Sequence, residues 1–242
     1  MVKVAAAQIP VTKNTLKNLE NIIKYIKKAA SKKVDIICFP EASLVHLRKK
    51  YSIEKIPVKT YINTIKKECK KNKIHCIFGT NILKNNKLYN SAFLIDDKGK
   101  IIYAYDKVNL WINERKEKVN GKKNKAVKTK FGKIGIIICW DIAYPEYVKM
   151  LGKQGAWIIF CPSYVVNYKR ELGSYEQLPY ARSFENSSYF VYCDAYARDT
   201  VKYSYICSPS RIYSKIRGKE GMIIADLDHR KIFGLRKRYR LV

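Results

Sequence analysis

The chain has 242 residues, of which 47% are hydrophobic, and a formal net charge of +29. This length and composition predict one globular domain over residues 1–242, with a basic C-terminal tail at about 230–242. No apolar run reaches the ~20 residues that a membrane-spanning helix needs. The first residues, MVKVAAAQIPV, are expected to form a strand rather than a signal peptide. We therefore expect a cytoplasmic protein without a membrane partner.

The cysteines and histidines argue against disulfides and metals. There are seven cysteines, an odd number, and none of them forms a Cys-x-x-Cys pair. A disulfide framework is therefore not expected, and most of these side chains should be small buried hydrophobes. A zinc site needs clustered ligands, and the chain has only three scattered histidines. We expect no metal and no cofactor.

The positive charge narrows the range of partners. The 49 cationic side chains comprise 38 lysines and only 11 arginines, spread along most of the chain. Arginine is preferred for bidentate phosphate recognition, so nucleic acid is not the expected partner. Scattered lysines are more typical of a biased composition and a solvated surface than of a nucleic-acid site. The positive charge would also favour encounter with an anionic substrate.

The first third of the chain alternates strands and helices. Apolar residues spaced by three and four predict an amphipathic helix over 14–31, between a strand at 2–8 and a short buried strand at 34–41. A second helix is expected over 54–72, followed by a strand at 75–83.

The remaining elements interrupt this alternation. Residues 88–97 and 100–110 flank a turn and predict a hairpin. The following elements are strands at 132–141, 156–163, 189–198 and 221–228, with helices beginning near 144 and spanning 174–188. Adjacent strands of this kind favour two sheets covered by helices over an all-parallel barrel.

Three reactive side chains end buried strands in this scheme. Glu41 ends VDIICFPE, Lys107 ends IIYAYDK, and Cys139 ends GKIGIIIC just before an expected helix. A cysteine at a helix start can have a lowered thiol pKa. A glutamate could accept its proton, and a lysine with the backbone N–H of Trp140 could stabilise an oxyanion. Taken singly, each has a simpler interpretation: an inert core cysteine, a helix N-terminal acid and one surface lysine among many.

Taken together, the segments around these residues resemble the nitrilase (carbon–nitrogen hydrolase) superfamily. The similar segments follow in order: AAAQIPV, ICFPEASL, NSAFLIDDKGKIIYAYDKVNL, GKIGIIICWDIAYPE, ARSFENSSYFVYCDA and EGMIIADLD. The resemblance implies a four-layer α-β-β-α sandwich that commonly forms a homodimer or a higher homo-oligomer and needs no metal or organic cofactor. It also implies that Glu41 is the general base, Lys107 the oxyanion stabiliser and Cys139 the nucleophile.

The resemblance further implies a second glutamate before a glycine. Glu114, seven residues before Gly121, fits that arrangement and would orient Lys107 and the attacking water, with Glu117 as its rival. The sequence departs from many members at Asn109, where they have histidine, and at Ala143, where many amidases have arginine.

The implied activity is hydrolysis of an amide or N-carbamoyl group on a small metabolite through a thioester. Nitrile hydrolysis uses the same residues, and transfer of the acyl group to an amine would share the thioester. A catalytically silent basic binding protein is the alternative from a different class, with RKIFGLRKRYRLV (230–242) as its best support. This tail is otherwise expected to be solvated or to contact a dimer partner.

Overall fold

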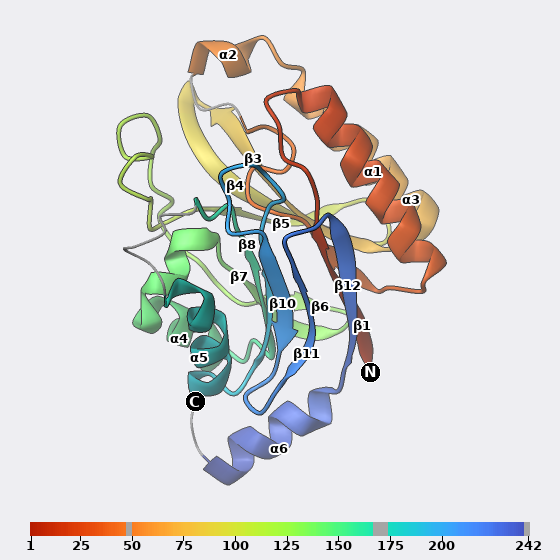
Figure 1. Cartoon of the computed structure of the whole chain (residues 1–242), viewed down its shortest axis with the longest axis vertical. Coiled ribbons are helices and arrows are strands. Elements are labelled where there is room, and N and C mark those ends of the chain that lie inside the picture. The colour runs from red at the N-terminus through yellow and green to blue at the C-terminus, as the bar shows by residue number, and fades with distance from the viewer. Residues whose placement is uncertain (47–49, 167–173, 240–242) are drawn as a thin grey trace.

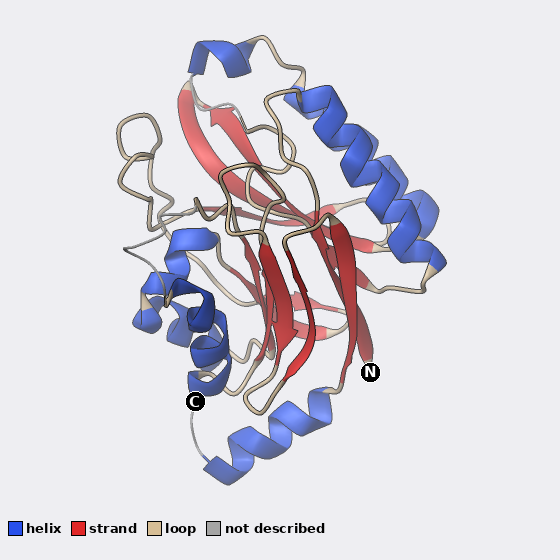
Figure 2. Ribbon diagram, viewed as in Figure 1, coloured by secondary structure: helices blue, strands red, loops and turns tan. Residues whose placement is uncertain are grey.

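The fold, given by a computed structural model, is described for residues 1–46, 50–166 and 174–239. Two six-stranded sheets pack face to face, and helices cover their outer faces (Figure 1). The strand orders are β12-β1-β2-β3-β4-β5 and β11-β10-β9-β8-β7-β6. The predicted α/β sandwich with two helix-covered sheets is confirmed, and Figure 2 shows the strands as the inner layers.

The first sheet has a parallel centre and antiparallel edges. Its strands are β1 (Val2–Gln8), β2 (Ile36–Cys38), β3 (His75–Lys84), β4 (Lys87–Ile95), β5 (Ile101–Asp106) and β12 (Gly221–Leu227). Strands β1, β2 and β3 run parallel to one another, and the remaining pairs are antiparallel. Helices α1 (Thr15–Ser31) and α3 (Val58–Asn72) cover its outer face, while the short α2 (Lys50–Glu54) lies at one end. The Asn14 side chain caps α1 by accepting a hydrogen bond from the Lys17 N–H.

The second sheet repeats this plan. Its strands are β6 (Val127–Thr129), β7 (Gly132–Ile136), β8 (Ile158–Pro162), β9 (Tyr189–Cys193), β10 (Tyr203–Cys207) and β11 (Ile212–Arg217). Strands β7, β8 and β9 are parallel. Helices α4 (Pro145–Lys153) and α5 (Leu178–Glu185) cover its outer face. Two 3-10 turns, η1 (Cys139–Ala143) and η2 (Tyr175–Gln177), lead into these helices.

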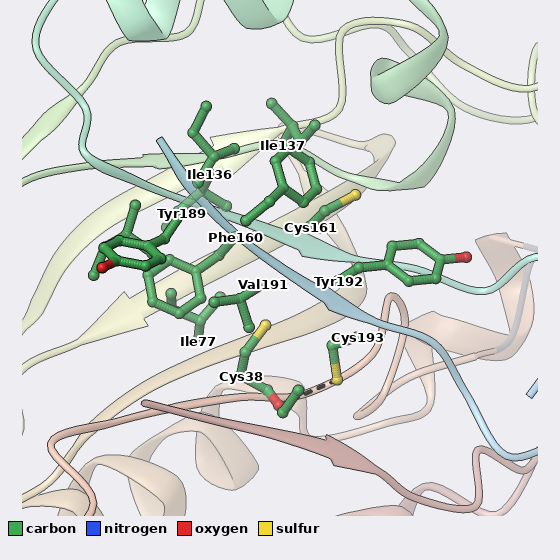
Figure 3. Close-up of a cluster of buried hydrophobic side chains, with 14 of the residues drawn as sticks. Cys38, Ile77, Ile136, Ile137, Phe160, Cys161, Tyr189, Val191, Tyr192 and Cys193 are labelled. Atoms are coloured by element: carbon green, nitrogen blue, oxygen red, sulfur yellow. Dashed lines mark hydrogen bonds between the residues drawn. The ribbon is translucent and has the colours of Figure 1, made fainter. Parts of the chain in front are cut away.

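The largest hydrophobic core fills the space between the two sheets. Ile77 of β3 meets Phe160 and Val191 of the second sheet there, as Figure 3 shows. Cys193 donates a hydrogen bond from its thiol to the Cys38 carbonyl oxygen at 3.2 Å, which links the sheets. All seven cysteines are free and buried, as expected for small hydrophobes.

Several element boundaries differ from the sequence-based prediction. The strand expected at 34–41 ends at Cys38, and the one expected at 132–141 ends at Ile136. The helix expected over 54–72 is divided at Pro57, which has no backbone N–H to donate. Strands β6, β10 and β11 were not predicted.

The described part of the basic tail is helical. It lies in helix α6 (His229–Tyr239), and residues 240–242 lie outside the described residues. None of the helices in the described part of the chain combines the length and hydropathy that crossing a bilayer requires.

Candidate active site

The sequence-predicted residues line one cavity. Its walls include Glu41, Lys107, Glu114, Cys139 and Trp140. The space between these walls, counted with the open mouth of the cavity, is about 640 Å³. Segments from both sheets contribute to it, so packing of the two layers creates the site.

A tight turn after β2 positions Glu41. The Glu41 N–H donates to the Ser163 carbonyl oxygen at 3.3 Å, and Ala42 has a φ of 52°. Gly79 of β3 lies directly beneath: a Cβ there would be 2.5 Å from the Ala42 nitrogen and 2.7 Å from the Glu41 Cα. The absence of a side chain at Gly79 therefore lets the turn approach the strand closely.

Cys139 lies on a strained turn between β7 and α4. Its φ is 45°, which is uncommon for a residue with a Cβ and is typical of functional positions. The buried Asp141 carboxylate stabilises this turn by accepting the Ile138 N–H at 2.9 Å. It also accepts both the backbone N–H and the side-chain amide of Asn109, at 2.9 and 3.0 Å. Asn109, one of the departures noted above, therefore ties the Lys107 loop to the cysteine turn.

A cluster of four charged side chains occupies the cavity floor. Lys107 Nζ lies 2.7 Å from Glu41 Oε1 and 2.7 Å from Glu114 Oε2. The other Glu114 oxygen pairs with Lys118 Nζ at 2.8 Å. Asn90 Nδ2 donates to Glu41 at 2.6 Å and to Glu114 at 2.8 Å. Two carboxylates and two ammonium groups thus balance in charge, which buried ionised groups require.

The ion pairs favour the charged forms of Lys107 and Glu114. Burial alone would lower the pKa of Lys107, but the Glu41 and Glu114 carboxylates outweigh it and raise that pKa well above its usual range. Burial likewise opposes ionisation of Glu114, yet Lys107 and Lys118 hold its pKa below the usual range. Lys107 and Glu114 are therefore both charged at neutral pH.

The Cys139 thiol has the opposite electrostatics from those expected at a helix start. Burial and the nearby Glu41 carboxylate raise its pKa well above the usual range, although Lys107 opposes them. The turn that follows is a short 3-10 segment, and Cys139 is only 8% exposed. These surroundings favour the thiol over the thiolate, so a base would have to remove the proton for Cys139 to act as a nucleophile.

The cavity also contains residues that were not predicted from the sequence, and those in contact with Glu41, Glu114 or Cys139 include Asn90, Lys118, Tyr164 and Tyr175. Asn90 is a polar residue inside the apolar strand β4, which is the one local signal that could have identified it. The Tyr164 N–H donates to Glu41 Oε2 at 2.9 Å, a contact between segments far apart in the chain. Glu117, the rival to Glu114, is exposed.

Aromatic rings form one wall of the cavity. The Trp140 ring meets Trp111 edge-on, with centroids 4.4 Å apart, and stacks parallel to Tyr175 at 6.1 Å. On the other side His46 stacks on Tyr164 at 4.4 Å. Within the described residues, no group of three His, Cys, Asp or Glu side chains could hold a metal ion. The groups that line the cavity and can carry chemistry include a thiol, two carboxylates and two ammonium groups.

Comparison with known proteins gives one consistent assignment. The sequence model for carbon-nitrogen hydrolases matches residues 3–237. The probable hydrolase nit2 of Schizosaccharomyces pombe is 30% identical, over 94% of this chain and 92% of that protein. The omega-amidase NIT3 of Saccharomyces cerevisiae is 28% identical over 64% of this chain, and the match spans a little over half of that relative, 58%. The crystal structure of Saccharomyces cerevisiae Nit3, of the nitrilase superfamily, superposes with a TM-score of 0.89 at 23% identity, covering 100% of this chain and 95% of that one. This chain belongs to the carbon–nitrogen hydrolase family.

Proposed function

We propose, from this membership and the cavity geometry, that the protein hydrolyses a linear C–N bond of a small amide through a Cys139 thioester. The observation that carries the proposal is the position of Lys107. Its ammonium group is held by both Glu41 and Glu114 in the cavity that contains the cysteine. This arrangement supports a base, a nucleophile and an oxyanion donor acting at one carbon.

In the first half of the reaction, Glu41 accepts the proton of the Cys139 thiol. The thiolate attacks the amide carbon, and the carbonyl oxygen becomes an oxyanion. The Lys107 ammonium and the Trp140 N–H stabilise that charge. Protonated Glu41 returns its proton to the nitrogen, the C–N bond breaks, and ammonia or an amine leaves a thioester behind.

In the second half, water replaces the departed amine. Glu41 takes a proton from this water, whose oxygen attacks the thioester carbon. The second tetrahedral intermediate is stabilised by the same donors, and its collapse breaks the C–S bond. The Cys139 thiolate recovers its proton from Glu41, and a carboxylic acid is released. Glu114 keeps Lys107 ionised and oriented through both halves.

The proposed substrate is a small amide or N-carbamoyl compound that can carry a negative charge. The cavity lining, aromatic rings together with a few charged groups, supports a small ligand. A relative named as an omega-amidase supports the amide bond as the target. The net charge of +29 supports steering of an anionic substrate toward the protein.

Ammonia release from small amides, N-carbamoyl compounds and nitriles tests the activity. We expect release from at least one amide or N-carbamoyl compound by the wild type and none above background by Cys139→Ala. Cys207→Ala is the matched control, because Cys207 is also a buried cysteine but does not line the cavity. Release that survives in Cys139→Ala, or absence of release from every compound by folded wild type, would contradict the proposal.

We also propose a cytoplasmic homodimer. Seven free cysteines support a reducing compartment. Exposed aromatic side chains on the α4–α5 face, Tyr144, Tyr180 and the 55% exposed Phe184, support that face as the contact between copies. Light scattering of the wild type and Phe184→Lys tests this, with the variant expected to be monomeric; unchanged mass in the variant argues for another interface.

A further inference from the structure

A tyrosine hydroxyl lies beside the cysteine sulfur. Tyr175 Oη donates to Cys139 Sγ at 3.7 Å, within the range of hydrogen bonds to sulfur. Tyr175 is only 5% exposed and belongs to η2, which is 36 residues from Cys139 in the chain. The proposed mechanism makes no use of this hydroxyl.

Contacts on two sides hold Tyr175 in place. Its ring lies parallel to that of Trp140, with an interplanar angle of 2°. The next residue, Glu176, accepts the Tyr205 hydroxyl of β10 at its carbonyl oxygen, at 2.6 Å, and pairs through its carboxylate with Arg217 of β11. These contacts hold η2 against the second sheet, and they keep the Tyr175 hydroxyl directed at the Cys139 sulfur.

The protonation states make this contact a one-way donation. Burial and the neighbouring Cys139 raise the pKa of Tyr175 well above its usual range, so the phenol keeps its proton. A neutral thiol can itself donate a hydrogen bond to the Tyr164 carbonyl oxygen, which lies 4.0 Å from the sulfur. A thiolate cannot donate, and it accepts from Tyr175 more strongly because hydrogen bonds to charged acceptors are about twice as strong as neutral ones.

The other charged and titratable groups around the sulfur do not duplicate this role. Glu41 opposes the thiolate by repulsion, and Lys107 favours it but is already shared by two carboxylates. Cys161 also opposes the thiolate, and the buried Tyr192 and Cys161 act on Tyr175 as well, where they raise the pKa of its phenol. A direct donor to the sulfur therefore offsets part of the penalty that burial imposes.

We propose that Tyr175 is a further catalytic residue, whose hydroxyl stabilises the Cys139 thiolate both as it forms for attack and as it leaves the thioester. In the attack step the S–H proton passes to Glu41, and the phenol keeps its own proton. In the second step the electron pair of the breaking C–S bond returns to sulfur. The same hydroxyl stabilises the resulting thiolate by donating a hydrogen bond to it. Both steps rest on the proposed function, whereas the stabilisation of the thiolate by the Tyr175 hydroxyl does not.

Alkylation of Cys139 by iodoacetamide as a function of pH tests the inference without any substrate. Tyr175→Phe keeps the ring stacked on Trp140 and removes only the hydroxyl. We expect the midpoint of the alkylation profile to rise by about one pH unit and the rate at neutral pH to fall about tenfold, the low end for losing a hydrogen bond to a charged group. Tyr61→Phe, on α3 and outside the cavity, is the matched control and should match the wild type.

A second measurement separates chemistry from structural damage. Replacing Tyr175 by 3-fluorotyrosine makes the phenol a stronger donor, so the alkylation midpoint should move downward, opposite to the shift in Tyr175→Phe. A Tyr175→Phe profile that superimposes on that of the wild type overturns the inference, as does a 3-fluorotyrosine midpoint that moves upward. Because alkylation needs no amide, failure of the protein to release ammonia would overturn the proposed hydrolysis and leave this result standing.

Discussion

Replacing Glu114 by glutamine tests the electrostatic core of the cavity. The Glu114 carboxylate accepts hydrogen bonds from Lys107 Nζ at 2.7 Å, from Lys118 Nζ at 2.8 Å and from Asn90 Nδ2 at 2.8 Å. Glutamine retains one acceptor oxygen and turns an NH₂ group toward an ammonium group. Of the four charges, one carboxylate and two ammonium groups would remain, and the cluster would carry an uncompensated positive charge.

The expected magnitudes follow from burial. Breaking a buried ion pair by removing one partner costs about 3–5 kcal/mol; because Glu114 faces a wet cavity, we take the lower end, about 3 kcal/mol. For a domain of this size that corresponds to a fall in Tm of about 6–12 °C. Lys107, with one partner lost, no longer holds its position, and losing one oxyanion donor lowers kcat by about 10²–10³-fold.

Thermal melts and ammonia release on Glu114→Gln and Glu117→Gln measure both effects. Glu117 is the matched control because it is an exposed glutamate three residues away. The melts should be repeated in acid. The lowered folded-state pKa of Glu114 means that its contribution is fully present above its unfolded pKa of about 4.3 and is lost as pH falls through the folded value. The stability gap between the wild type and Glu114→Gln should therefore narrow below about pH 4.

Two results would refute this reasoning. If Glu114→Gln and Glu117→Gln melt at the same temperature and turn over at the same rate, Glu114 does not hold Lys107 in the way that the contacts indicate. If Glu114→Gln is destabilised but keeps its full kcat, the ion pair is structural only, and the orienting role assigned to Glu114 is wrong.

Three further substitutions address neighbouring parts of the site. Glu41→Gln should lower turnover by about 10²–10⁴-fold, the contribution typical of a general base, with a native circular dichroism spectrum; a near-normal rate would exclude Glu41 as the base. Gly79→Ala should lower stability by about 1–3 kcal/mol in urea melts and reduce turnover as well, since its Cβ would be 2.5 Å from the Ala42 nitrogen. Unchanged melts would mean that the turn shifts freely. Lys118→Met leaves Glu114 paired with Lys107, so its loss of turnover should be smaller than that of Glu114→Gln; an equal or larger loss would give Lys118 a direct role.

Local pattern was sufficient for many of the elements. Apolar residues at helical spacing placed the helix at 14–31, within one residue of the observed α1. Continuous apolar runs placed the central strands, because strands buried on both faces need no polar alternation. Predicted strand ends were wrong where the chain leaves the sheet without a change to polar residues: Pro40 and Glu41 lie in a turn, and Cys139 begins η1 rather than ending a strand.

The β10–β11 hairpin shows why pattern alone is insufficient. Its outer strand, IYSKIR, has only one buried residue and two charged ones, and it belongs to the sheet because it pairs with β10 along its length. Pairing between strands depends on neighbours in space, which a local window of sequence does not contain.

The sequence by itself determined which side chains could carry chemistry, because Glu41, Lys107 and Cys139 follow largely apolar runs of sequence and match one family in order. The run before Lys107 is nevertheless mostly exposed in the structure, in strand β5. Only the tertiary structure decided how these side chains lie relative to one another and which groups surround them. In the structure Asn90 and Lys118 contact the cavity carboxylates, and the Tyr175 hydroxyl contacts the Cys139 sulfur. The pKa of the Cys139 thiol is raised, whereas the sequence pattern had suggested that it would be lowered. Burial and distances between segments far apart in the chain set these properties, because desolvation and Coulomb interactions depend on position in space rather than on order along the chain.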